Sequence, residues 1–161
     1  MRPSTLILGL GNPLRGDDGV GPRLVEGLKR RCLPEGVTAL DGGTGGLDLI
    51  RLLEERRRVV IVDAADVGRE PGEYVRFTPD QVRLAGASNA LSLHHAGLSE
   101  VLMLADALDL ELPEIVIFGV QPEAIGWHEG LSPAVATSLA ALTDAVLQEI
   151  EGDDNAQDSS N

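Results

Sequence analysis

The stretch LILGLGNPLRGDDGVG, residues 6–21, leads from an apolar strand through a glycine turn into a helix. Residues 5–10 form a short, continuous apolar run, which is typical of a strand buried on both faces. After the turn, apolar residues recur with the spacing of one helix face, at Val20, Leu24, Val25 and Leu28. The stretch therefore predicts a strand, a loop and a helix in succession.

The same alternation continues along the chain. Further strands are predicted over 37–40, from Val59 to Asp63, over 74–77 and over 115–120, with helices over 49–58, 99–108 and 133–150. Ser132 is expected to cap the last helix, with Pro133 at its first position. Strands that alternate with helices favour a parallel sheet covered on both faces. We expect an α/β fold: a three-layer α/β/α sandwich with a mostly parallel five-stranded sheet, in which 74–77 is an edge strand.

Size, charge and cysteine content limit the class of protein. The chain has 161 residues, from which we expect a single α/β domain over 1–150, followed by a disordered acidic tail, EGDDNAQDSSN, over 151–161. The formal net charge of -13 would repel nucleic acid. Cys32 is the only cysteine, and the sequence shows neither a secretion signal nor an apolar run long enough to span a bilayer. We therefore expect a cytoplasmic protein with no nucleic-acid or membrane partner.

The candidate site lies at one edge of the predicted sheet, since ligands of such sheets collect beyond the carboxyl ends of the strands. Asp17 and Asp18 follow the first strand, and Asp63 ends the strand that begins at Val59. The loop SLHH, which could reach the same edge, carries His94 and His95, of which at most one should be a ligand because neighbouring extended residues point apart. Two carboxylates and one imidazole make an incomplete coordination set, open to water or substrate. The pattern indicates a divalent-metal site.

Simpler explanations exist for several of these residues. GLGNPL resembles the start of a dinucleotide-binding motif, but Leu14 replaces its third glycine and the acids that follow would repel a pyrophosphate. An Asp before a helix is a common N-cap, so Asp17 or Asp18 could be structural. The glycine-rich segment 41–46 is either a cleft wall that accepts an extended peptide or a plain connection. For His128, in GWHEG, an exposed or wall-lining position is expected rather than ligation.

Five blocks in order carry a resemblance to a known family: GLGNPLRGDDGVG, DGGTGGLDL, VDAAD, SLHHAGLSEVL and GVQPE. From about Thr5 to Ile150 the sequence resembles the hydrogenase maturation proteases. Peptidyl-tRNA hydrolases look similar through LILGLGNP, but their pattern continues toward a tyrosine and a catalytic histidine, and this chain has no histidine before His94. The resemblance to the maturation proteases is the more specific of the two.

This resemblance implies an endopeptidase, with a phosphorylase/hydrolase-like fold, that removes the C-terminal extension from the precursor of a nickel-iron hydrogenase large subunit after nickel insertion. It implies Asp18, Asp63 and His94 as the nickel ligands and catalytic residues, with Asp17 as a helix cap or a supporting group. We expect the precursor to supply the nickel, other divalent metals to be able to substitute, and the protease to be a monomer. The alternatives are a nickel-sensing or chaperone-like binding module that has lost cleavage and, less favoured, a peptidyl-tRNA hydrolase.

Overall fold

The computed structural model describes residues 5–44, 46, 48–81, 92–93 and 96–158 of the chain. The strands are β1 (Thr5–Leu10), β2 (Val37–Gly43), β3 (Arg58–Asp66), β4 (Tyr74–Phe77), β5 (Ser92–Leu93) and β6 (Glu114–Val120). The helices are the 3-10 turn η1 (Gly16–Gly19), α1 (Val20–Lys29), α2 (Asp48–Glu54), α4 (Ala96–Ala107) and α5 (Pro133–Asp158). Across these described ranges, no helix is both long enough and apolar enough to cross a membrane.

The strands form one mostly parallel sheet in the order β2-β1-β3-β6-β4. β1 pairs in parallel with β2 and β3, and β3 pairs in parallel with β6. β4 lies at one edge of the sheet, as its alternating pattern predicted, and pairs antiparallel with β6. The short β5 pairs with the end of β3. The predicted five-stranded, mostly parallel sheet is confirmed, with β5 as an addition.

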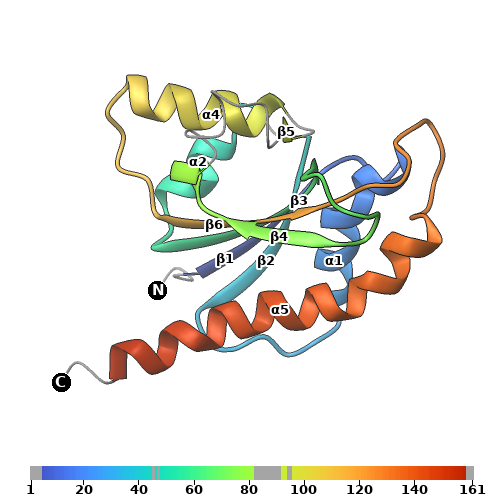
Figure 1. Cartoon of the computed structure of the whole chain (residues 1–161). Coiled ribbons are helices and arrows are strands. Elements are labelled where there is room, and N and C mark those ends of the chain that lie inside the picture. Colours follow the sequence, from blue (N-terminus) through green and yellow to red (C-terminus); the bar gives the residue numbers. More distant parts are fainter. Residues whose placement is uncertain (1–4, 45, 47, 82–91, 94–95, 159–161) are drawn as a thin grey trace.

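Helices cover both faces of this sheet, which gives the three predicted layers (Figure 1). α1 and α5 pack on one face, where Leu24 and Val146 lie against strand residues such as Val60. α2 and α4 pack on the other, where Leu53 and Leu102 lie against the opposite side of the strands. Successive residues of β1 and β3 point to opposite faces and are buried on both, which explains their continuous apolar sequence.

The turn after β1 brings α1 unusually close to the sheet. A Cβ added at Gly21 would lie 2.5 Å from the carbonyl oxygen of Leu10 and 2.6 Å from that of Val62. These neighbours are backbone atoms of β1 and β3, so they have no side-chain freedom with which to move away. Gly21 therefore lets the first turn of α1 rest on the carboxyl ends of the two central strands.

The boundary between α2 and β3 differs from the prediction. Arg58 was expected at the end of a helix, but α2 ends at Glu54 and Arg58 is the first residue of β3. Its guanidinium donates hydrogen bonds to the Glu149 backbone carbonyl at 2.8 Å and to Glu149 Oε1 at 2.7 Å. The position of the Arg58 side chain is therefore explained by a long-range ion pair with Glu149 of α5. The electrostatics of a helix end, on which the prediction was based, does not explain it.

The C-terminal segment also differs. The chain after residue 150 was expected to be disordered, but α5 continues without a break to Asp158. Residues 151 and 152 are exposed, so burial does not hold the first two residues of this extension. Backbone hydrogen bonds that propagate from the packed part of α5 account for it, because adding residues to an existing helix costs much less than starting one. The start of α5 at Pro133, after Ser132, agrees with the prediction.

Candidate active site at the carboxyl end of the sheet

Asp63 lies inside the sheet, at the edge where the site was expected. β3 continues beyond it to Asp66, so Asp63 does not end the strand as predicted but pairs with Gly119 of β6. Pairing between β1 and β3 stops one residue earlier, at Val62 opposite Gly9. The Asp63 side chain is completely buried. A carboxylate withdrawn from water in this way must be hydrogen-bonded, paired or bound to a cation.

Asp18 approaches the same edge from η1. It is 1% exposed, and its Oδ2 accepts a hydrogen bond from the Asn12 backbone N–H at 2.9 Å. η1 lies against β3, and Gly21, about one turn further on, approaches the carbonyl oxygen of Val62. The fold therefore places Asp18 and Asp63, which are 45 positions apart in the sequence, at the carboxyl ends of β1 and β3.

Asp17 points away from its neighbour and into the loop between β6 and α5. Its Oδ2 accepts hydrogen bonds from the backbone N–H groups of Glu123 at 2.9 Å and Ala124 at 3.1 Å. Ser132 adds two more, from its N–H to Oδ1 at 2.7 Å and from its hydroxyl to Oδ2 at 2.8 Å. Burial raises the pKa of Asp17, but the bonds from Ser132, Ala124 and Glu123 outweigh it and hold the pKa below its ordinary value.

These bonds assign different roles to the two adjacent acids. Neither η1 nor α1 has a side-chain hydrogen bond at its N-cap, so the helix-cap interpretation of Asp17 is wrong for its own helix. Asp17 instead holds Ser132, the residue that precedes α5, together with the loop before it. Its four accepted hydrogen bonds make Asp17 a positioning residue that joins η1 to this loop.

The third predicted ligand, His94, lies outside the described residues, as does His95. The described residue next to it is Leu93, which pairs with Ala65, two positions beyond Asp63 on β3. Among the residues that the structure does describe, no three His, Cys, Asp or Glu side chains form a group that could hold a metal ion. The described part therefore supplies two carboxylates at this edge, and the imidazole stays a prediction.

The loop between β6 and α5 forms one wall of this edge. The Gly16 N–H donates to the His128 carbonyl at 2.7 Å, and the Asp17 N–H donates to the Ala124 carbonyl at 3.1 Å. A Cβ on Gly16 would lie 2.6 Å from Cε1 of the His128 ring. His128 is exposed and rests on η1, as the wall-lining prediction had it.

The sequence did not reveal that Arg15, just before η1, stacks on Trp127 of that loop. The Arg15 guanidinium carbon lies 5.2 Å from the centre of the Trp127 ring. Nor did it reveal the contact between Asp17 and Ser132. These pairs are more than a hundred positions apart, and no local pattern marks such a contact.

The glycine-rich segment after β2 is only partly described. β2 runs three residues further than predicted, to Gly43, and Asp41 is exposed with its Oδ1 accepting the Gly43 N–H at 2.8 Å. Asp41 therefore stabilises the local turn.

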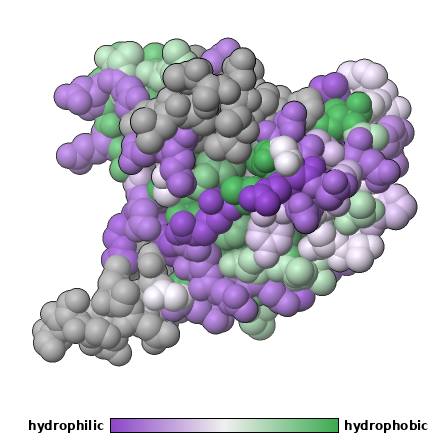
Figure 2. All heavy atoms as spheres, viewed as in Figure 1, coloured by the Kyte–Doolittle hydropathy of each residue, from purple (hydrophilic) through white to green (hydrophobic). Residues whose placement is uncertain are grey.

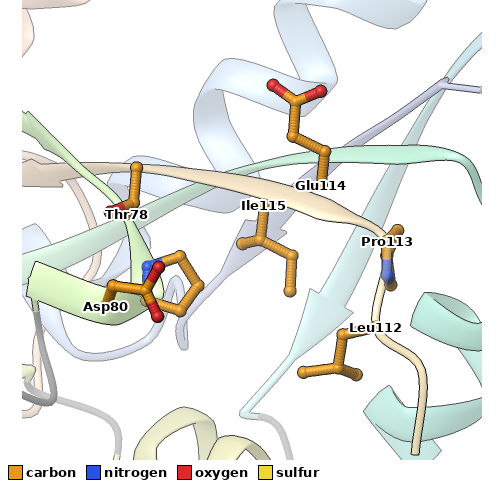
Figure 3. Close-up of a pocket in the computed structure, with 7 residues that line it drawn as sticks. Thr78, Asp80, Leu112, Pro113, Glu114 and Ile115 are labelled. Atoms are coloured by element: carbon orange, nitrogen blue, oxygen red, sulfur yellow. The ribbon is translucent and has the colours of Figure 1, made fainter.

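A cavity of about 310 Å³ lies at the opposite end of the sheet, where β6 begins (Figure 3). Leu112 and Ile115 contribute apolar side chains to it, together with Thr78 and Asp80 after β4. The Glu114 carboxylate points away from the other labelled side chains. The strand lengths separate this cavity from Asp18 and Asp63, so it takes no part in the candidate site.

The two buried aspartates of this edge suit a hard or borderline divalent cation. Asp18 and Asp63 both offer carboxylate oxygens in a place that excludes water, where a cation would offset the burial of negative charge. Carboxylates with an imidazole form a mixed oxygen and nitrogen set, which nickel accepts. The two aspartates thus fit part of the predicted nickel site.

Comparison with known proteins identifies the family. The family model described as hydrogenase maturation protease matches residues 22–149, which is most of the chain. The chain belongs to the hydrogenase maturation proteases. Members of this family hydrolyse peptide bonds, so the protein is a peptidase, and the matched range includes Asp63 and the loop that carries Trp127.

The proteins similar to this chain include both sequence relatives and solved structures. The hydrogenase expression/formation protein HupD of Bradyrhizobium diazoefficiens is 40% identical over 145 residues, covering 89% of this chain and 76% of HupD. The hydrogenase 2 maturation protease of Escherichia coli is 36% identical, covering 88% and 87%. The structure of the hydrogenase maturating endopeptidase HybD from E. coli superposes with a TM-score of 0.80 at 33% identity, covering 95% and 94%.

Proposed function

We propose that this maturation protease is a nickel-dependent endopeptidase that removes the C-terminal extension from the precursor of a nickel-iron hydrogenase large subunit. The observation that carries the proposal is the pair of buried carboxylates, Asp18 and Asp63, at the carboxyl ends of β1 and β3. The substrate of the protease is a precursor polypeptide that already carries nickel. Recognition of the inserted nickel confines cleavage to precursors whose metal centre has been loaded.

The aspartates and His94 complete the coordination of the nickel that the precursor brings. Leu93, next to His94, pairs with Ala65 near Asp63, which supports a common site for these residues. Three ligands without those of the precursor form an incomplete shell, so the free protease should bind nickel weakly. The described residues provide no Ser-His-Asp arrangement for a covalent route at this edge, and the single cysteine, Cys32, is exposed beyond the far end of α1.

Within this site the protease holds the scissile bond next to the nickel. When bound, nickel supplies positive charge that favours a polarised carbonyl and a deprotonated water. A carboxylate beside it is suited to accept the proton of the attacking water, which would make the protease aspartyl-type. Asp17 helps to position Asp18, because its hydrogen bonds fix η1 to the loop between β6 and α5.

The direct test is cleavage of two preparations of the same precursor, one loaded with nickel and one without. Intact-mass measurement after incubation should show loss of a C-terminal peptide only from the nickel-loaded precursor. If both preparations are cut equally, the nickel dependence is wrong. If neither is cut although the protease binds the loaded form, the protein is the binding module considered above. We further propose that it works as a monomer in the cytoplasm, with no membrane or nucleic-acid partner, and size-exclusion chromatography tests the monomer.

A further inference from the structure

An exposed tryptophan stands beside the candidate site. Trp127 is the only tryptophan in the chain, and 80% of its surface is exposed. Leu14, in the loop before η1, is 52% exposed, and the next residue, Arg15, stacks on the Trp127 ring. We call Leu14, Arg15 and Trp127 the rim platform. In a protein with 2% aromatic residues, an indole placed in water calls for an explanation.

The backbone under the rim platform is held firmly. Arg15 forms an isolated parallel bridge with His128, and the Gly16 N–H donates to the His128 carbonyl. Below them, the buried Asp17 carboxylate ties the loop to η1 through four hydrogen bonds. The fold thus fixes two loops that present exposed side chains, and the exposed Trp127 ring itself gains little burial in return. A preorganised surface of this kind lowers the free-energy cost of binding a partner.

The charge of the rim platform also differs from that of the protein as a whole. Arg15 carries a positive charge in a chain of net charge -13, and its Nε is buried with no hydrogen-bond partner among the described residues. Trp127 covers one face of the guanidinium, which leaves the remaining N–H groups as donors for a carboxylate. Tryptophan and arginine are the residues that most often dominate the energy of protein interfaces.

We propose that the rim platform is a docking surface for the hydrogenase large-subunit precursor, where it binds a segment that carries an apolar side chain beside a carboxylate. The proposal rests on the proposed function, since Arg15 adjoins the Gly16–Gly19 turn that contains Asp18. A polypeptide that reaches Asp18 from this side would cross Arg15 and Trp127. In Figure 2, a small hydrophobic group lies among near-neutral and hydrophilic residues on the side of the molecule where η1 and this loop are found.

The kinetic test compares platform variants with a matched control. Trp127→Ala and Arg15→Gln should each raise KM for the nickel-loaded precursor at least about tenfold, while kcat stays within about twofold. Trp127→Phe should recover part of the loss, because a smaller aromatic ring still packs. Leu108→Ala is the control: Leu108 is 58% exposed but follows α4 at the opposite end of the sheet, so KM should not change. The midpoint of urea unfolding should be unchanged in all variants, which would show that a change in KM reflects docking and not a loss of stability.

A binding measurement that does not need cleavage completes the test. Labelling with 5-fluorotryptophan gives one fluorine resonance, because Trp127 is the only tryptophan. Nickel-loaded precursor should shift or broaden this resonance, and Arg15→Gln should weaken the effect. Cleavage with an unchanged resonance and unchanged KM would overturn the docking proposal and leave the proposed function standing. A shifted resonance without cleavage would support the docking proposal and overturn the proposed function. If the precursor neither shifts the resonance nor is cleaved, both proposals are wrong.

Discussion

The carboxylate of Asp17 accepts both the backbone N–H of Ser132, at 2.7 Å, and the hydroxyl of Ser132, at 2.8 Å. The two residues lie 115 positions apart, and Ser132 immediately precedes α5. This pair joins the turn after β1 to the start of the last helix. It therefore fixes the relative positions of η1, which carries Asp18, and the loop that carries Trp127.

Removal of the Asp17 carboxylate should destabilise the protein strongly. Asp17→Ala leaves the N–H groups of Glu123, Ala124 and Ser132 without their acceptor in a part-buried region, so the free energy of unfolding should fall by about 3 kcal/mol or more. Asp66→Ala is the control, because the Asp66 side chain is exposed and, among the described residues, accepts a single long bond from the Gly68 N–H at 3.3 Å. Its change should stay within about 0.5 kcal/mol. Urea denaturation measures both. Equal losses in the two variants would refute the joining role of Asp17.

Two glycines of α1 should respond in opposite directions to alanine. A Cβ at Gly21 meets backbone oxygens at 2.5 and 2.6 Å, so Gly21→Ala should reduce the free energy of unfolding by about 1–3 kcal/mol or prevent folding. A Cβ at the exposed Gly27 meets nothing within 4 Å, so Gly27→Ala should increase it by about 0.5–1 kcal/mol. Thermal melts of both variants test the close approach of α1 to the sheet. A Gly21→Ala protein as stable as wild type would contradict it.

Glu149 should make the stability of the protein depend on pH. The hydrogen bond from Arg76, opposed by burial and reinforced by the charges of Arg76 and Arg58, holds the pKa of Glu149 below its ordinary value of 4.5. The carboxylate therefore stabilises the fold fully above about pH 4.5, and this contribution is lost as the pH falls through the lower pKa of the folded state.

The comparison that isolates this effect is Glu149→Gln against wild type. The substitution should lower the free energy of unfolding by about 1–3 kcal/mol at pH 7, because the buried Arg58 loses its shorter ion pair, to Glu149, and keeps the 3.5 Å contact with Glu114. The difference between the two proteins should shrink as the pH is lowered below about 4.5. Glu151→Gln, at an exposed position two residues further on, should change little at either pH. A difference that does not vary with pH would argue against the ion pair as its source.

Local sequence patterns predicted the architecture well because it depends on short apolar runs. β1 and β4 have the predicted bounds, and the alternation of strands and helices led to the right order of layers. The patterns failed where a distant contact decides. In the sequence Arg58 resembles a cation at a helix end, and only the folded structure shows its contact with Glu149. The part of α5 after residue 150 carries no periodic apolar residues from which a helix could be predicted.

The candidate site was predictable to a similar extent. The rule that ligands gather at the carboxyl ends of parallel strands selected Asp17, Asp18 and Asp63, and all three are buried at that edge. The rule could not distinguish Asp17 from Asp18, because the difference lies in donors from Glu123, Ala124 and Ser132. Those donors come from a loop whose position only the folded chain reveals.

Substitution of the buried acid in β3 tests the central claim most directly. Cleavage of the nickel-loaded precursor should be slower by at least about a hundredfold in Asp63→Asn, which keeps the size of the side chain and removes its charge. The matched variant Asp66→Asn, three residues along the same strand and exposed, should cut at the wild-type rate. A folded Asp63→Asn protein that processes the precursor as fast as Asp66→Asn would contradict the account.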